Sequence, residues 1–236
     1  MINVCVLFLG YIREIPVVSY LPFICVKGSC YSGGACANIK RCFTLYKFKN
    51  RKEVAELNIW HDIEQDRIKY NDFTMIIEIS KGSKVKYELD KETGLLIMDR
   101  ILYTSTHYPA NYGFIPRTYA PDNDPLDVLL LCSEQILPMT LVRCYPIGVI
   151  SMKDQGFQDD KIIAVPFGDP TYNSYKDVRD LPAHVFSEMT HFFSVYKTLE
   201  GKATALESVH DASIAEQIVR DCIESYNTKF TPHNAH

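Results

Sequence analysis

Three runs of sequence decide the fold: DVLLLC (127–132), LVRCYPIGVISM (141–152) and KIIAVP (161–166). Each run is apolar along most of its length, which is typical of strands that are buried on both faces. Shorter β-branched or alternating runs precede them, namely TMIIEI (74–79), VKYEL (85–89) and LLIM (95–98). Turn residues around Gly82 and Gly94 separate the shorter runs, so we predict a series of short strands between residues 74 and 166.

The periodicity changes after residue 180. Apolar residues then recur at helical spacing on one face, at Val185, Met189, Phe192, Phe193 and Tyr196. A second helix is predicted to start near the capping-box pattern Ser213-Ile-Ala-Glu216, with Ile214, Ile218 and Cys222 on one side. Strands followed by helices favour an α+β fold, in which a small closed β-barrel has helices packed on its flank.

Charge is distributed unevenly along the chain of 236 residues. Residues 1–57 carry eight Lys and Arg against three Asp and Glu, a net charge of +5, whereas residues 58–236 carry 17 against 26, a net charge of −9. A general nucleic-acid binder is usually basic, so the acidic body argues against that class. An acidic body of this size tends to attract metal ions or cationic partners.

Residues 1–57 form a leader of different composition. Five of the eight cysteines lie in it, at spacings unlike the C-x₂-C pairs of zinc sites. The apolar run 2–9 is too short to span a bilayer, and it lacks the preceding charge and the small-residue cleavage site of a secretory signal. We therefore expect a poorly structured leader, a single body of residues 58–236, and a cytoplasmic protein without membrane contact. A targeting peptide and an over-extended start are the alternatives for the leader.

An acidic loop, Asp122-Asn-Asp-Pro-Leu-Asp127, stands directly before the buried strand predicted at 127–132. Carboxylates this close together repel one another, and a divalent cation would remove that repulsion while taking the oxygen ligands that a hard ion prefers. A second acidic loop contains Asp154, Asp159 and Asp160. Either loop alone favours a solvated turn, and the two together leave a metal site and solvated turns as equal alternatives. The EF-hand pattern is excluded, because the first loop lacks the Gly and the Glu required at the sixth and twelfth positions.

Cationic and phenolic side chains suited to phosphate occur in the same region. Lys86 and Glu88 alternate along a predicted strand and therefore point to one face, with Tyr87 on the other. The remaining candidates are Arg100 at a strand end, Tyr108 and Tyr112 in a Gly/Pro turn, Lys161, Tyr196 and Lys197. Each alone is explained by an ion pair or a core tyrosine, whereas together with the acidic loops they indicate a site for a small, highly charged phosphate. Neither a P-loop nor a G-x-G-x-x-G motif occurs, so no nucleotide cradle is indicated.

The motif Asp122-x-Asp124-Pro-x-Asp127-Val128 resembles the signature of family I soluble inorganic pyrophosphatases, and the compact body is similar to the bacterial members. Further matches occur in the family's order and spacing: Glu78, Lys86-Tyr-Glu88, Arg100, Tyr108-Pro-x-Asn-Tyr112-Gly, Asp154, Asp159-Asp-Lys161 and His191-Phe-Phe…Tyr196-Lys197. The resemblance covers roughly residues 58–230, which is nearly the whole body, and leaves out the leader.

The resemblance implies a five-stranded OB-type barrel, homohexameric assembly, and Mg²⁺-dependent hydrolysis of inorganic diphosphate to two phosphates with several ions at the site. It implies that Asp124 is the general base for the attacking water. The implied metal ligands are Asp122, Asp127, Asp154 and Asp159, with Glu78 and Glu88 acting mostly through water. The implied phosphate-holding groups are Lys86, Arg100, Tyr108, Tyr112, Lys161, Tyr196 and Lys197. Asp160 departs from the pattern and is interpreted as a bystander.

Two rival functions are kept beside this interpretation. A metal-dependent hydrolase of a larger diphosphate, such as a nucleotide, would need an aromatic or apolar slot for the base, and the sequence shows no dedicated one. An OB-type nucleic-acid module would need a basic groove with exposed aromatic residues, in contrast to the acidic loops of this body.

Overall fold

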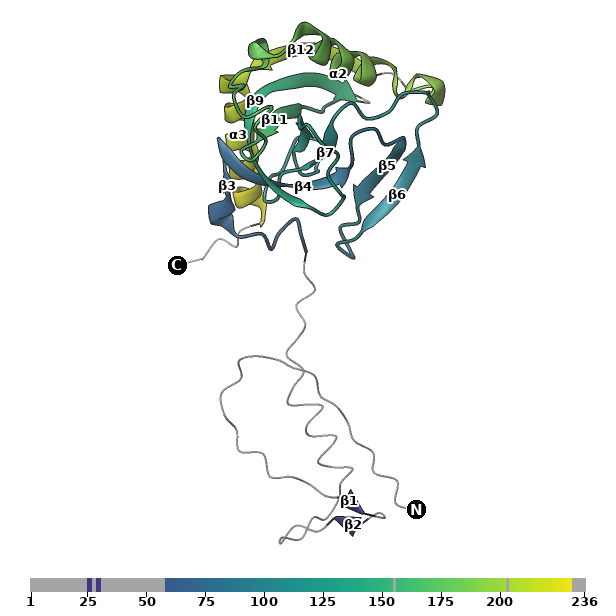
Figure 1. Ribbon diagram of the computed structural model, residues 1–236, viewed down its shortest axis with the longest axis vertical. Coiled ribbons are helices and arrows are strands. Elements are labelled where there is room, and N and C mark those ends of the chain that lie inside the picture. The colour runs from purple at the N-terminus through teal and green to yellow at the C-terminus, as the bar shows by residue number, and fades with distance from the viewer. Residues whose placement is uncertain (1–24, 27–28, 31–57, 155, 203, 231–236) are drawn as a thin grey trace. The chain divides into compact units, whose positions relative to one another are not determined.

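The computed structural model describes residues 25–26, 29–30, 58–154, 156–202 and 204–230 of the chain (Figure 1). The chain divides into two compact units, Met1–Ala55 and Glu56–His236. In the first unit the short strands β1 (Cys25–Val26) and β2 (Ser29–Cys30) pair antiparallel. The rest of the leader, including its predicted lack of structure, lies outside the described residues.

The second unit is built on one large sheet. Its strands are β3 (Ile68–Lys69), β4 (Asp72–Ile79), β7 (Asn111–Phe114), β8 (Asp127–Leu130), β9 (Leu141–Asp154), β10 (Phe157–Gln158), β11 (Lys161–Pro166) and β12 (Thr204–Asp211). Neighbouring strands follow the order β10-β9-β11-β8-β7-β4-β3, and β12 also pairs with β9. Because β4 pairs with β9 as well as with β7, the pairing returns to its starting strand and the sheet is ring-like. The neighbours β8 and β11 are parallel.

A separate hairpin and two α-helices surround this sheet (Figure 1). The hairpin consists of β5 (Val85–Leu89) and β6 (Leu96–Ile101), and β5 contacts β4. The helix α2 (Ala183–Val195) contacts β12, and α3 (Ala212–Phe230) contacts β9 and β12. Single 3₁₀ turns occur at η1 (Gln65–Arg67), η2 (Val178–Asp180) and η3 (Thr198–Glu200). Among the helices that the structure describes, none is long and apolar enough to cross a membrane.

The core explains why the strand sequences are continuously apolar. In β11, Ile163 and Val165 belong to the apolar cluster that includes residues of α2, whereas Ile162 and Ala164 belong to the cluster that includes residues of α3. Successive side chains of a strand point to opposite faces, so both faces of β11 are covered and every residue of the strand is buried. The predicted strand at 161–166 is therefore confirmed, together with its burial on both sides.

The end of the chain departs from the prediction in three details. The strand β12 lies between the two helices, so strands and helices do not follow in two blocks. The helix α3 begins at Ala212, and the carboxylate of Asp211 accepts the Ile214 N–H at 3.2 Å. Asp211 rather than Ser213 therefore caps it. Ile214, which the prediction placed on one side of the helix with Ile218 and Cys222, is exposed, and the buried stripe comprises Ala215, Val219, Cys222 and Tyr226.

The segment around Tyr112, predicted as a Gly/Pro turn, contains the strand β7. This strand pairs antiparallel with β4, and at an irregularity in the pairing the two backbones come so close that a Cβ atom on Gly113 would lie 1.8 Å from the Ile76 carbonyl oxygen. Only glycine fits such an approach of two backbones. The described residues thus form a sheet-dominated α+β fold with a ring-like sheet, which agrees with the predicted class.

Candidate active site

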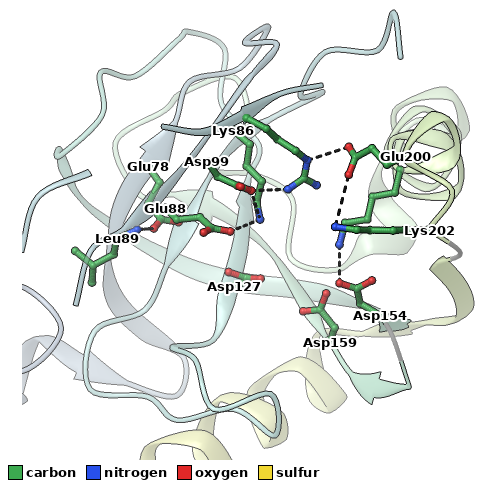
Figure 2. A network of polar contacts seen from close by, with 12 residues as sticks. Glu78, Lys86, Glu88, Leu89, Asp99, Asp127, Asp154, Asp159, Glu200 and Lys202 are labelled. Atoms are coloured by element: carbon green, nitrogen blue, oxygen red, sulfur yellow. Dashed lines mark hydrogen bonds and ion pairs between the residues drawn. The ribbon is translucent and has the colours of Figure 1, made fainter. Parts of the chain in front are cut away.

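A cavity of about 540 Å³ lies between the β5–β6 hairpin, the ring-like sheet and the end of α2. Every residue that the sequence predicted for the site lines it: Glu78, Lys86, Glu88, Arg100, Tyr108, Tyr112, Asp122, Asp124, Asp127, Asp154, Asp159, Lys161, Tyr196 and Lys197. Figure 2 shows several of these side chains converging from different elements. The fold therefore brings residues separated by more than a hundred positions to one polar cavity.

The acidic loop before β8 has a defined backbone conformation. Asn123 adopts a left-handed conformation, with φ of 73°, which asparagine tolerates better than most residues. The Asp124 N–H donates to Asp122 Oδ1 at 3.1 Å, and the Asp124 carbonyl accepts the Ala120 N–H at 2.8 Å. These bonds hold the loop closed while the Asp124 side chain stays 52% exposed and contacts Lys91.

Strand register explains how Lys161 reaches two acidic residues. The parallel strands β8 and β11 begin side by side, with Lys161 paired to Asp127. The ammonium of Lys161, whose side chain is 4% exposed, contacts the carboxylates of Asp127 and Asp159. Burial disfavours the charged ammonium, but the two carboxylates outweigh burial and raise the pKa of Lys161. The lysine is therefore held positively charged inside the cavity.

Negative charge nevertheless remains in excess. Burial raises the pKa of Glu78 to about 8, helped by the charge of Asp127 and opposed by the Leu89 N–H, which donates to the Glu78 carboxylate at 2.8 Å. Burial also raises the pKa of Asp122 to about 6, again with a contribution from Asp127. The pKa of Asp159 is raised by burial despite the opposing charge of Lys161. Such shifts identify carboxylates that lack sufficient positive charge around them.

The β5–β6 hairpin supplies cations to the opposite side of the cavity (Figure 2). Lys86 and Arg100 are directly paired across the hairpin, and a bulge next to them lets Asp99 reach both. Lys86 contacts Glu88 and lies 3.3 Å from Asp99, which confirms that Lys86 and Glu88 share a face. Arg100 Nε donates to Glu200 Oε1 at 2.9 Å.

Two buried atoms of the site have no hydrogen-bond partner within the described part of the chain: Arg100 Nη2 and Asp154 Oδ1. The other oxygen of Asp154 accepts from Lys197 Nζ at 2.5 Å. Burial lowers the pKa of Lys197, and the hydrogen bond to Asp154 opposes that effect. Because buried polar groups normally have partners, a donor and an acceptor without partners in the described part of the chain, on two residues that line the same cavity, favour binding of both an anion and a cation there.

Three buried phenols complete the lining. Tyr108 and Tyr112 lie with ring centroids 5.5 Å apart, and Tyr196 stacks on Phe192 at 5.1 Å. Burial raises the pKa of Tyr108, Tyr112 and Tyr196 above the usual tyrosine value. Their hydroxyl groups therefore stay protonated and can donate hydrogen bonds to an anion.

The donor set fits a hard divalent cation. The acidic side chains offer oxygen ligands only, which Mg²⁺ prefers. Added positive charge would be favourable near the carboxylates with raised pKa values and near Asp154 Oδ1, which has no partner among the described residues. Within the described residues, no group of three or more His, Cys, Asp or Glu side chains is already arranged around one point. Two of the carboxylates, Asp127 and Asp159, instead share the Lys161 ammonium.

Several lining or supporting residues escaped the sequence interpretation. Among them are Tyr87, Asp99, Phe157, Phe193 and Lys202 in the cavity wall, and Glu200 behind Arg100. The position of Asp99 next to Arg100 in the sequence was a signal that could have identified it. Neighbouring residues of a regular strand point to opposite faces, and the bulge in the hairpin lets Asp99 reach the same side as Arg100. Glu200 carried no such signal, because its partner is a hundred residues away.

Comparisons with known proteins identify relatives of the second unit. The family model described as inorganic pyrophosphatase matches residues 75–227. "Soluble inorganic pyrophosphatase 2" of Chlamydomonas reinhardtii is 46% identical over 173 residues, which cover 73% of this chain and 90% of that protein. A soluble inorganic pyrophosphatase of Solanum tuberosum is 48% identical over 177 residues, covering 75% of this chain and 83% of the relative.

Solved structures of bacterial proteins are also similar. The inorganic pyrophosphatase of Helicobacter pylori has a TM-score of 0.67 at 38% identity, covering 70% of this chain and 99% of that one. The inorganic pyrophosphatase of Thermus thermophilus has a TM-score of 0.68 at 35% identity, covering 72% and 99%. The residues matched by the family model, 75–227, lie in the unit that contains the cavity.

Proposed function

The chain belongs to the inorganic pyrophosphatase family and is an inorganic diphosphatase, and on this premise we propose that it depends on Mg²⁺ and uses Asp124 as its general base. One observation carries the proposal. The same cavity is lined by eight carboxylates and only five Lys and Arg side chains, together with three buried phenols that stay protonated. A metal–diphosphate complex has the matching distribution of positive and negative charge.

The residues proposed to hold several Mg²⁺ ions are Asp122, Asp127, Asp154 and Asp159, with Glu78 and Glu88 acting mostly through water. A bound divalent cation would lower the pKa of a coordinated water and neutralise charge on the phosphate oxygens. The raised pKa values of Glu78 and Asp122, which arise first from burial and then from the charge of Asp127, support this assignment, because a nearby cation would favour the charged carboxylates and so oppose each shift.

Asp124 is suited to remove a proton from the attacking water. Its half-exposed side chain borders the cavity, and its N–H bond to Asp122 ties the base to the neighbouring predicted ligand. A carboxylate in this position would accept the proton of the water as the water approaches phosphorus. The loop geometry therefore supports a base placed beside the metal site.

The phosphate groups are proposed to lie against Lys86, Arg100, Tyr108, Tyr112, Lys161, Tyr196 and Lys197. Charge on the transferring and leaving phosphoryl groups is stabilised mainly by positioned cations and donors rather than by covalent chemistry. Arg100 Nη2 is a buried donor that has no partner among the residues the structure describes, which makes it a good match for a phosphoryl oxygen. After cleavage, the same cations would hold the leaving phosphate.

A substrate comparison tests the function. We expect Mg²⁺-dependent phosphate release from diphosphate far above that from ATP. Preference for ATP would favour the larger-diphosphate hydrolase, and tight single-stranded nucleic-acid binding without hydrolysis would favour the nucleic-acid module. Asp124→Asn should lower turnover by about 10²–10⁴-fold at an unchanged melting temperature. The matched control is Asp160→Asn, which alters only the acceptor of the Gln158 side-chain amide and should keep parental turnover.

Membership of the family also leads us to propose a closed OB-type barrel and a homohexameric assembly. The cyclic pairing of β9, β11, β8, β7 and β4 supports a closed OB-type barrel. Exposed apolar side chains on and beside β6 support a homohexamer, because contact between copies would cover them: Leu95, Ile97, Met98, Ile101 and Tyr103. Light scattering of the purified enzyme measures the assembly directly. A monodisperse monomer would contradict the proposed hexamer.

Residues 58–236 are proposed as the complete catalytic domain in a cytoplasmic enzyme, consistent with relatives named as soluble pyrophosphatases. A protein that begins at Asn58 should hydrolyse diphosphate as the full chain does. Aggregation or a much lower melting temperature of the shorter protein would show that residues 1–57 stabilise the domain. Cell fractionation tests the compartment.

A further inference from the structure

Arg100 is held by a buried carboxylate from a distant part of the chain. Glu200 ends the 3₁₀ turn η3 that follows α2, whereas Arg100 lies on β6. Arg100 Nε donates to Glu200 Oε1 at 2.9 Å, and the two side chains are only 17% and 7% exposed. A charge-assisted bond that is largely shielded from solvent is stronger and better oriented than an exposed ion pair.

The other contacts of the guanidinium define what Glu200 contributes. Arg100 Nη1 contacts the carboxylate of Asp99, and Nη2 is buried without a partner in the described part of the chain. A guanidinium is planar and rigid, so bonds at Nε and Nη1 fix the direction of the N–H groups at Nη2. Arg100 lines the cavity, which makes Nη2 the donor left for a bound ligand.

Glu200 is better suited than its neighbours to fix this orientation. Asp99 is shared between Arg100 and Lys86, which lies 3.3 Å away. The second oxygen of Glu200 is 3.9 Å from the ammonium of Lys202, whose side chain is 47% exposed. In Figure 2, Glu200 and Lys202 lie together, to the right of Lys86 and Asp99. Arg100 is therefore the close, enclosed partner of Glu200.

We infer that Glu200 is a positioning residue, which holds Arg100 so that its Nη2 group meets a phosphoryl oxygen of diphosphate. The inference rests on the proposed role of Arg100 in binding substrate. Glu200 itself touches neither substrate nor metal in this arrangement. It connects the turn after α2 to the β5–β6 hairpin, and thereby joins the cations of both elements in one geometry.

A double-mutant cycle tests the inference with diphosphate and Mg²⁺. Glu200→Ala should lower kcat/KM by roughly 10- to 100-fold, the range of a hydrogen bond to a charged group, and mainly through a higher KM. Glu200→Gln keeps an acceptor for Arg100 Nε and should recover most of the loss. In an Arg100→Ala background, Glu200→Ala should change kcat/KM by less than about twofold.

The matched control is Glu64→Gln, which alters an exposed glutamate 3.5 Å from Arg67 and outside the cavity. It should leave both kinetic constants unchanged. An equal loss from Glu200→Ala with and without Arg100 would overturn the inference, as would parental KM in Glu200→Ala. If Arg100→Ala alone leaves kcat/KM unchanged, the proposed substrate contact itself is wrong. Thermal unfolding of each variant identifies any loss that comes from unfolding alone.

Discussion

Replacement of Lys161 by alanine should expose the repulsion between the carboxylates of the site. The ammonium lies between Asp127 and Asp159, both of which are partly buried. Its pKa is raised above the usual value by these two carboxylates, which outweigh the effect of burial. A raised lysine pKa contributes stability that is fully present below the unfolded-state value and is lost only as the pH rises through the folded-state value. Lys161 therefore contributes throughout the neutral range.

The expected magnitude follows from the enclosure of this cluster. Removing one partner from a buried ion pair costs about 3–5 kcal/mol, because the remaining charge has no compensation. For a domain of this size, 1 kcal/mol corresponds to about 2–4 °C in Tm. Lys161→Ala should thus lower the Tm of the metal-free protein by roughly 6–20 °C. The loss should shrink as the pH falls, because burial raises the pKa of Asp159 and so favours its uncharged form.

Thermal unfolding followed by circular dichroism, in EDTA and in Mg²⁺, measures this effect. Added Mg²⁺ should recover part of the loss, because cation binding to the folded state supplies the missing positive charge. The control is Lys153→Ala, which removes an exposed pair with Glu207 at 2.6 Å and should cost no more than about 1 kcal/mol. A Tm change for Lys161→Ala in EDTA no larger than that of the control would refute the reasoning.

Three further predictions concern the metal site and the sheet. Asp127→Ala should abolish most of the Mg²⁺-induced rise in Tm together with activity, and an unaltered rise would exclude Asp127 as a ligand. The pKa values of Glu78 and Asp122 are raised to about 8 and about 6 in the folded protein. The folded protein therefore binds these protons more tightly than the unfolded chain, and the free energy of unfolding decreases as the pH rises from the unfolded-state pKa values to the folded-state ones. The Tm in EDTA should therefore fall from pH 5 to pH 9, and Glu78→Gln should flatten that curve; a parental slope would contradict it. Gly113→Ala should prevent folding or lower the Tm severely, because its Cβ would clash with backbone. The control Gly168→Ala, with open space around it, should be tolerated.

The strands that could be predicted are those that form a continuous apolar or alternating run in the sequence. The runs at 85–89 and 161–166 match β5 and β11 residue for residue. By contrast, β7 is a four-residue strand inside a Gly- and Pro-rich segment, and it forms because β4 and β8 lie on either side of it. The strand β12 is mostly polar and partly exposed, and its pairing partner β9 lies some fifty residues earlier. The strands β7 and β12, which the sequence did not predict, depend on long-range pairing, which local periodicity does not contain.

The residues of the site likewise differ in whether local sequence or long-range packing brings them to the cavity. Asp122, Asp124 and Asp127 could be predicted together, because one short loop carries all three side chains into the cavity. Lys161 joins them through the parallel register of β8 and β11, and its position after a second acidic loop made it recognisable. Glu200 acts on the cavity only through Arg100, so neither its residue type nor its neighbours in sequence mark it. A residue proposed to bind metal or phosphate must have a carboxylate, a cationic group or a hydroxyl group, and the residue type shows this directly in the sequence. A group that orients another one needs only to be in the right place, and the η3 turn after α2 sets that place for Glu200 by bringing it to Arg100 of the hairpin.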